Sequence, residues 1–201
     1  MIEVTVDGGL QTLTINRPDK ANALTEAMLN ELAEAVEGSD AQALILTGAG
    51  KVFSAGADLE DVRNGTLATS PAWERLSGAI AAFDGLSIAA LNGSCAGGAM
   101  GMILACDLRI AVPSAKFFYP VIKMGVLPQP SDPARLKALV GGSLAKRILL
   151  TGAKITADEA LGAGLVDHLS EDVLRDAAAW AQPALDAKPG QVAAIKALID
   201  R

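Results

Sequence analysis

The amino-acid sequence predicts an α/β protein, because strand patterns and helix patterns alternate along most of the chain. Short apolar runs typical of buried strands are separated by segments with apolar residues at helical spacing. Hydrophobic residues make up 51% of the 201 residues and aromatic residues only 3%, so the core is expected to pack from small side chains. We expect one compact domain, with a core over residues 1–142 and a mainly helical region over residues 143–201.

The elements of the N-terminal half are predicted from alternation, turns and caps. Residues 2–6 and 10–15 alternate between apolar and polar side chains, which predicts a hairpin turning at Asp7-Gly8-Gly9. Thr25 is the expected N-cap of a helix that Gly38 ends. The elements expected next are a strand at 43–47, a loop at 54–62 that opens into a helix, a helix at 71–83, a strand at 87–91, a turn and helix at 92–106, and a strand at 108–112.

The C-terminal half is predicted to be mainly helical. A strand-like and loop segment at 116–125 precedes three prolines that form a rigid connection. The segment TADEALGAGLVD predicts a short helix with a glycine stop and then a strand. The other expected helices cover 134–140, 143–151, 171–187 and 189–200.

Composition and charge exclude several classes of function. The net charge is −6 and no basic patch is interleaved with aromatic residues, so nucleic acid is not the expected partner. Residues 85–106 carry no charge and are long enough to cross a membrane, but their Asn92-Gly93 turn and glycine cluster favour a buried strand, turn and helix. Cys95 and Cys106 share this apolar segment, which favours reduced, buried thiols in a cytoplasmic protein. No secretory leader is expected. A single histidine and the cysteine spacing predict no metal site.

Two segments share one design, in which an apolar strand and a turn lead through small residues into a helix. They are ALILTGAGKVFSAGADL and SIAALNGSCAGGAMGM. Helix N-termini carry unpaired N–H groups, and Ala55-Gly56-Ala57 and Gly97-Gly98 have almost no side chain to block them. Two such loops brought together can aim two donors at one oxygen, as an oxyanion hole. Tight helix packing is the alternative for the glycines alone, but the pair of loops favours the oxyanion hole.

Four spaced motifs resemble those of the crotonase, or enoyl-CoA hydratase/isomerase, superfamily. The resemblance covers nearly the whole chain, and the motifs occur in the family's order. They are Asn16-Arg17-Pro18 with Lys20 and Asn22-Ala23-Leu24; Phe53 to Leu59; Asn92-Gly93 with Gly97-Gly98 and Cys106-Asp107; and Thr151-Gly152 with Ala157, Glu159-Ala160 and Gly164-Leu165-Val166.

This resemblance implies a spiral of ββα units with a C-terminal helical region used in trimerisation, and an acyl-CoA thioester as ligand. It implies no cofactor beyond the CoA moiety. By position, Ala57 and Gly98 would supply the two oxyanion-hole amides. The residues implied along the path of CoA are Lys20, Ala21, Ala55, Asp58 and Leu59, with Arg17 and Lys20 as candidates to meet the phosphates.

The chain departs from the hydratases of this family at their acids. They carry one glutamate in the glycine-rich helix and a second before the following loop, where this chain has Gly101 and Val121. Some isomerases of the family carry an acidic residue at the position where this chain has Gln129. Without a carboxyl group at these positions we predict negligible hydration of crotonyl-CoA. Isomerisation, thioester hydrolysis or decarboxylation, which use the same oxyanion hole, are expected instead.

Two remaining polar residues are candidates for acid–base work. Tyr119 is either a donor of a hydrogen bond or proton, or a half-buried strand tyrosine. Asp132 is either a substitute acid, or a cap, with Ser131, of the helix that follows. His168 is interpreted as a surface residue rather than a base.

Three functions are therefore compared. The first is an acyl-CoA enzyme, and the second is an acyl-CoA-binding protein without catalysis. A serine hydrolase using Ser54 or Ser94 is disfavoured because the single histidine is distant in sequence. Apolar faces in the last helix, including Val192, Ile195 and Leu198, predict a homotrimer or a dimer of trimers, with no membrane partner.

Overall fold

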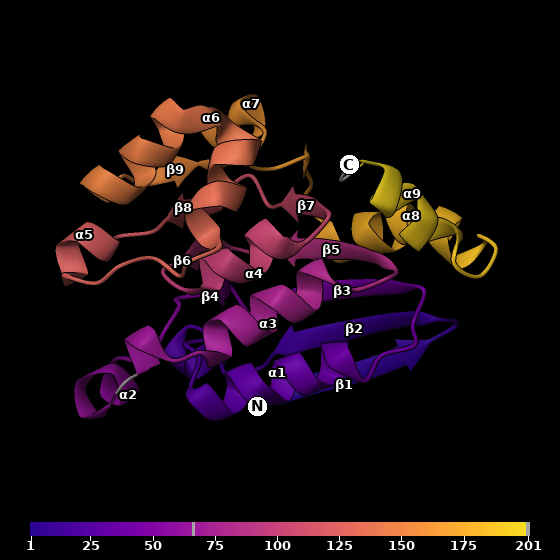
Figure 1. The fold of residues 1–201 in the computed structure, drawn as a ribbon, viewed down its shortest axis with the longest axis horizontal. Coiled ribbons are helices and arrows are strands. Elements are labelled where there is room, and N and C mark those ends of the chain that lie inside the picture. Colours follow the sequence, from indigo (N-terminus) through magenta and orange to yellow (C-terminus); the bar gives the residue numbers. More distant parts are fainter. Residues whose placement is uncertain (66, 200–201) are drawn as a thin grey trace.

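The computed structural model describes residues 1–65 and 67–199, and within them the strands form two sheets (Figure 1). The larger sheet has the order β1 (Ile2–Asp7), β2 (Leu10–Ile15), β3 (Ala43–Gly48), β5 (Leu86–Leu91), β7 (Leu108–Ala111) and β10 (His168–Leu169). The smaller sheet has the order β4 (Val52–Ser54), β6 (Ser94–Ala96), β8 (Lys116–Phe118) and β9 (Ile155–Thr156).

The helices follow the strands in a regular order along the chain. They are η1 (Pro18–Lys20), α1 (Glu26–Glu37), α2 (Leu59–Asn64), η2 (Leu67–Thr69), α3 (Ala72–Ala81), α4 (Ala99–Ala105), α5 (Val121–Met124), α6 (Asp132–Thr151), α7 (Ala157–Ala163), α8 (Val173–Leu185) and α9 (Gln191–Ile199). Three successive units, β3-β4-α2, β5-β6-α4 and β7-β8-α5, each place one strand in either sheet and then a helix. The predicted α/β class and spiral of ββα units are therefore confirmed.

The strand pairing explains how the spiral positions its loops. β1 and β2 pair antiparallel, as the predicted hairpin requires. From β2 through β3, β5 and β7 to β10 the neighbours are parallel. In the smaller sheet β4, β6 and β8 are parallel as well, and only β9 runs antiparallel to β8. Because β4 and β6 run side by side in the same direction, the loops that follow them lie at the same end of the smaller sheet.

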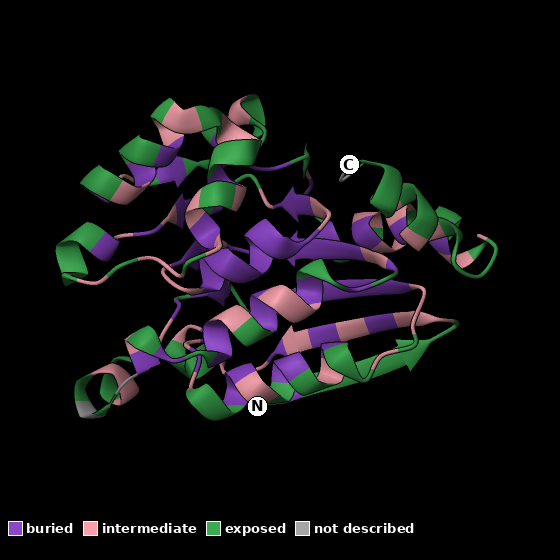
Figure 2. Cartoon of the chain, viewed as in Figure 1, coloured by how far each residue is buried: buried purple, intermediate pink, exposed green. Residues whose placement is uncertain are grey.

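Helices cover both faces of the larger sheet, which is why its central strands read as continuous apolar runs (Figures 1 and 2). All of β3 is buried. Leu44 and Leu46 belong to the cluster that packs with α1, α3 and α4, whereas Ala43 and Ile45 face α8 on the other side. The edge strand β1 is mostly exposed, with only Ile2 buried.

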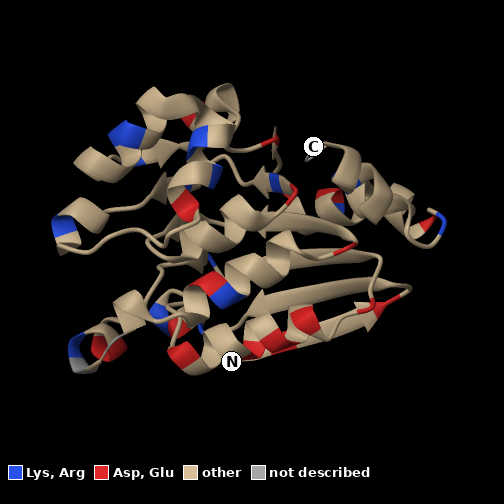
Figure 3. Cartoon of the chain, viewed as in Figure 1, with Lys and Arg blue, Asp and Glu red and all other residues tan. Residues whose placement is uncertain are grey.

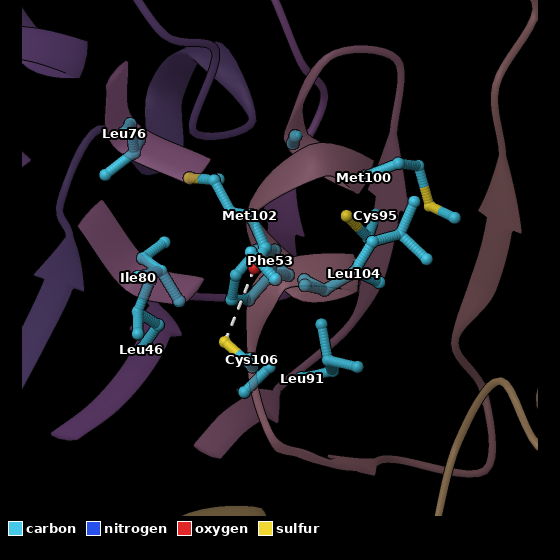
Figure 4. Packing of buried hydrophobic residues seen from close by; sticks show 14 of the residues in the cluster. Leu46, Phe53, Leu76, Ile80, Leu91, Cys95, Met100, Met102, Leu104 and Cys106 are labelled. Atoms are coloured by element: carbon cyan, nitrogen blue, oxygen red, sulfur yellow. Dashed lines mark hydrogen bonds between the residues drawn. The ribbon is translucent and has the colours of Figure 1, made fainter. Parts of the chain in front are cut away.

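The helix α4 lies at the centre of the core and is buried along its whole length. Figure 4 shows its Met102 and Leu104 packed with side chains of the neighbouring strands. Cys95 and Cys106 are free and buried there, as the sequence predicts. Burial raises the pKa of both thiols, and Cys106 donates a hydrogen bond of 3.4 Å to the carbonyl of Met102.

Several short elements differ from the sequence-based expectation. The turn region after β5 contains the strand β6, and the loop region after β8 contains the helix α5. The strand expected within 165–167 lies instead at β10. The helices expected at 134–140 and 143–151 form one element, α6, with a non-helical break at Gly141. Residue 200 of the last expected helix lies outside the described residues.

None of the helices in the described ranges is long and apolar enough to span a bilayer. The uncharged stretch 85–106 is divided among β5, β6 and α4, as the turn residues within it suggest.

Candidate active site

The loops after β4 and β6 touch each other through glycine. Gly56 has a φ of +89°, and a Cβ added there would lie 2.6 Å from the carbonyl oxygen of Ala96. Only glycine combines that backbone conformation with so close an approach. On its own side, the first loop is held by Ser54, whose hydroxyl donates to the carbonyl of Asn22 at 2.8 Å and accepts from the Gly56 amide at 3.1 Å. The two loops are thus fixed against one another.

The amides of Ala57 and Gly98 have no hydrogen-bond acceptor among the described residues. Their neighbours do: the Asp58 amide donates to the carbonyl of Leu24 at 2.9 Å, and the Gly97 amide donates to the carbonyl of Phe118 at 3.0 Å. Ala57 and Gly98 are both partly exposed and line the same cavity. Two free amides beside one cavity can stabilise a negative charge that develops on a bound oxygen.

The cavity has a volume of about 120 Å³ and a mainly apolar lining. Leu59, Met124 and Leu127, at its rim, are 60%, 45% and 85% exposed. Trp73 forms part of its wall, and a Cβ added at Gly98 would lie 3.0 Å from the indole ring. The lining residues are Ala55, Ala57, Leu59, Val62, Ala68, Trp73, Ala96, Gly97, Gly98, Phe118, Tyr119, Pro120, Val121, Met124, Val126, Leu127 and Gln129.

Two larger grooves of about 700 and 880 Å³ lie elsewhere, one between the C-terminal ends of α1 and α3 and the α8–α9 region, and the other between α8, α9 and α6. Neither is lined by any residue that the sequence predicts for the site. Size therefore does not identify the site here, and the smaller cavity is the better candidate because it contains the free amides.

Tyr119 and Asp132 form a buried pair next to this cavity. The Tyr119 hydroxyl donates to Oδ2 of Asp132 at 2.9 Å and accepts from the Gln129 amide at 3.3 Å. Asp132 is 1% exposed, and its Oδ1 has no hydrogen-bond partner in the described part of the chain. Burial raises the pKa of Asp132 to about 6; the negative charge of Glu74 adds to this, while Tyr119 and Arg135 oppose it. Burial also raises the pKa of Tyr119.

Two structural roles that the sequence offered for these residues, a half-buried strand tyrosine and a helix cap, are wrong. Tyr119 is 3% exposed, so it is a buried residue after β8 rather than a half-buried strand residue. No side chain caps α6. The amide and hydroxyl of Ser131, at the cap position, both donate to Glu74, and Asp132 turns inward because the Tyr119 hydroxyl is its partner there.

The residues implied along the CoA path lie around the first loop. Lys20 is exposed on η1, and the carbonyl of Ala21 accepts from the Ala55 amide at 3.0 Å. Arg17 is already engaged, since its guanidinium donates to the carbonyl of Ala23 at 3.1 Å and to Asp58 Oδ2 at 2.6 Å. This ion pair holds the pKa of the Asp58 carboxyl below its usual range.

Asp58 also accepts from the amides of Glu60 and Asp61, as the N-cap of α2. Its carboxylate therefore holds Arg17 and α2 in place around the loop.

The structure shows organising residues that sequence reasoning missed. Asn22 has a φ of +55°, and its side-chain amide donates to the carbonyls of Ala49 and Val52 at 2.9 and 2.7 Å, which ties the first motif to the turn after β3 and to the start of β4. Trp73, whose indole N–H donates to the carbonyl of Leu67 at 2.8 Å, is the second. Asn22 belongs to the first motif, and the tolerance of asparagine for the left-handed conformation is a further local signal of its role, whereas no local signal marks Trp73.

The arrangement does not form a serine-hydrolase triad among the described residues. The Ser54 hydroxyl donates to a backbone carbonyl and not to a base. His168 has a 47% exposed side chain, packs on Trp180 with a ring separation of 5.7 Å and lies 3.7 Å from Asp176. Its interpretation as a surface residue is confirmed, although it lies within β10 itself. No group of three or more metal-ligating side chains gathers anywhere in residues 1–65 and 67–199.

Solved structures with the same architecture place the chain in the crotonase-fold class of α/β proteins. An enoyl-CoA hydratase/isomerase from Pseudoalteromonas atlantica superimposes with a TM-score of 0.90 at 32% identity, covering 98% of this chain and 82% of that one. DspI from Pseudomonas aeruginosa superimposes with a TM-score of 0.91 at 33% identity, covering 99% and 86%.

Sequence comparison leads to the family. The family model for enoyl-CoA hydratase/isomerase matches residues 5–201. The protein named probable enoyl-CoA hydratase echA8 of Mycobacterium leprae is 38% identical over an alignment of 192 residues, which covers 89% of this chain and 73% of that protein. The 2,3-dehydroadipyl-CoA hydratase of Escherichia coli is 39% identical over an alignment of 167 residues, which covers 78% of this chain and 64% of that protein. The chain belongs to the enoyl-CoA hydratase/isomerase family.

Proposed function

We propose that this chain is an enzyme that binds acyl-CoA thioesters and stabilises a thioester enolate or oxyanion with the amides of Ala57 and Gly98. The observation that carries the proposal is that both amides lack an acceptor and their residues line one cavity. Chemistry next to a thioester carbonyl moves negative charge onto its oxygen, and donors held in place beforehand stabilise that charge without reorganising.

Other features support an acyl-CoA ligand. The apolar lining and rim of the cavity suit an acyl group. Lys20, Ala21, Ala55, Asp58 and Leu59 remain the residues proposed for the CoA path. A basic residue also lies on each of α2 and α5, the two helices that flank the cavity (Figure 3): Arg63 on α2, and Lys123 on α5, which donates to the carbonyl of Gly152 at 3.2 Å.

For the phosphates we favour Lys20 over Arg17. The Lys20 side chain is exposed, whereas the Arg17 guanidinium is committed to Asp58 and a backbone carbonyl.

We propose that the reaction is of the isomerase, hydrolase or decarboxylase type rather than hydration. The positions that the family resemblance matches to the hydratase acids hold Gly101, which has no side chain, and Val121, whose side chain is apolar and buried. Neither can orient or deprotonate a water molecule. The relatives named hydratases make a crotonyl-CoA hydration assay the direct test of this point.

The oxyanion hole is tested by comparing two variants at one position. Gly98 has a φ of −59°, within the range that proline requires, so Gly98→Pro removes the amide hydrogen without demanding a different φ at this position. Gly98→Ala is the matched control, because it adds the same Cβ against Trp73 and keeps the amide. Turnover on a panel of acyl-CoA thioesters is expected to fall on the order of 10²–10³-fold more in the proline variant. Equal effects of the two variants would show that the Gly98 amide plays no such role.

A second candidate is a non-catalytic acyl-CoA-binding protein, which is favoured by the same lack of acids at Gly101 and Val121. It predicts calorimetric binding of butyryl-CoA without turnover on any member of the panel. A homotrimer or hexamer is proposed in either case, since Ile195, Leu198 and Ile199 on α9 are 50%, 63% and 75% exposed and form an apolar surface that self-association would bury.

A further inference from the structure

We propose that Asp132 holds the proton that the site transfers, and that it acts through Tyr119. Asp132 belongs to α6, and its carboxylate occupies the space that a side chain at position 101 of α4 would fill. The inference rests on the proposed function and deepens it, because it selects chemistry that moves a proton at the acyl α-carbon.

The first step is the contact between Asp132 and the bare backbone of Gly101. A Cβ added at Gly101 would lie 2.8 Å from Oδ1 and 3.0 Å from Oδ2 of Asp132. A side chain at position 101 and the present carboxylate therefore exclude each other. The Gly101 amide donates to the carbonyl of Gly98 at 3.0 Å, so the backbone that the carboxylate contacts lies about one helical turn along α4 from Gly98.

The second step is the unsatisfied oxygen. Oδ1 of Asp132 is buried without a hydrogen-bond partner among the described residues. Leaving a buried polar atom unpaired costs free energy, and such atoms call for an explanation when a fold retains them. An α6 cap role does not supply one, because the side chain turns away from its own helix.

The third step is access to the cavity through Tyr119. Tyr119 lines the cavity and donates its hydroxyl hydrogen to Oδ2. One lone pair of the phenol oxygen accepts the Gln129 amide, and the second has no donor among the described residues. The phenol is thus placed between the buried carboxylate and the cavity in which an acyl group would bind.

The proton balance is as follows. The α-carbon C–H bond breaks, and its electron pair forms the enolate double bond while negative charge moves onto the thioester oxygen. The proton goes to the Tyr119 oxygen as the phenol proton goes to Oδ2 of Asp132. The reverse transfers return a proton to the carbon skeleton, at the α-carbon or at another carbon of the conjugated system.

The charged groups that face Asp132 keep its pKa in a range where the carboxyl can both accept and donate a proton near neutral pH. Glu74 from α3 raises its pKa, and Arg135 from α6 lowers it. With burial, these effects bring the pKa to about 6, close to the value that general acid–base catalysis needs.

The test measures exchange of the α-hydrogens of butyryl-CoA with deuterium in D₂O by NMR, across pH. The native chain should exchange them with a rate that rises through about pH 6. Asp132→Asn should lower the rate on the order of 10²–10⁴-fold and remove this inflection, while the calorimetric Kd for butyryl-CoA stays within about twofold. Asp176→Asn on α8 is the control and should behave as the native chain does.

Tyr119→Phe keeps the carboxylate and removes only the relay, so it covers the case in which Asp132→Asn does not fold. It should lose exchange to a similar extent. Exchange with an unchanged pH inflection in either variant would overturn the inference, as would butyryl-CoA binding to the native chain without exchange. A native chain that does not bind butyryl-CoA at all would overturn the proposed function instead.

Discussion

Asparagine at position 132 is expected to change how the stability of the protein depends on pH. The pKa of Asp132 is about 6 in the folded chain against an ordinary value of 3.8. At 1.36 kcal/mol per pKa unit, this difference corresponds to about 3 kcal/mol. Asp132 is 1% exposed, so solvent screening does not reduce this figure appreciably.

The sign follows from the direction of the shift. A carboxyl whose pKa is raised by folding contributes stability when protonated, which is complete below pH 3.8, and that contribution is lost as pH rises through about 6. The asparagine side chain of the Asp132→Asn variant cannot ionise. The variant's free energy of unfolding, relative to the native chain, should therefore increase by about 2 kcal/mol between about pH 4 and pH 8.

The assay is urea unfolding followed by circular dichroism at a series of pH values. Asp176→Asn serves as a control of opposite sign, because Arg175 lowers the pKa of Asp176, and the stability it contributes is lost as pH falls. A difference between Asp132→Asn and the native chain that stays constant with pH, or that decreases as pH rises, would contradict the raised pKa of this buried carboxyl.

Three further outcomes are expected. The native chain should hydrate crotonyl-CoA negligibly in an absorbance assay. The variant Gly101→Glu should misfold, because the Asp132 carboxylate fills the space that the new side chain needs, whereas the double variant Gly101→Glu with Asp132→Gly should fold. Gly56→Ala should lower the free energy of unfolding by about 2 kcal/mol or more in urea titrations, because a Cβ meets a carbonyl at 2.6 Å; a loss under about 0.5 kcal/mol would refute the close approach. Light scattering should give a trimer or hexamer that Leu198→Asp dissociates, and a native monomer at micromolar concentration would refute this.

Much of the fold is determined by local patterns. The hairpin, the Thr25 cap and the buried strand at 43–47 follow from alternation, capping chemistry and apolar runs, and they lie where the sequence predicts them. The strands β6 and β9 and the helix α5 are too short to show a period. They exist because neighbouring strands pair with them or because the chain turns there, which no local pattern records.

In the candidate site, too, local sequence predicts some residues and only the tertiary structure assigns the others. The small residues predict the two loops that hold Ala57 and Gly98, and the family resemblance selects these two residues within them. That the loops meet needs only parallel neighbouring strands. The roles of Tyr119 and Asp132 could not be assigned from sequence, where a cap and an acid look alike before a helix. Only the tertiary structure decides between them: the missing side chain of Gly101 leaves room for the carboxylate, and the Tyr119 hydroxyl gives it a partner inside the protein.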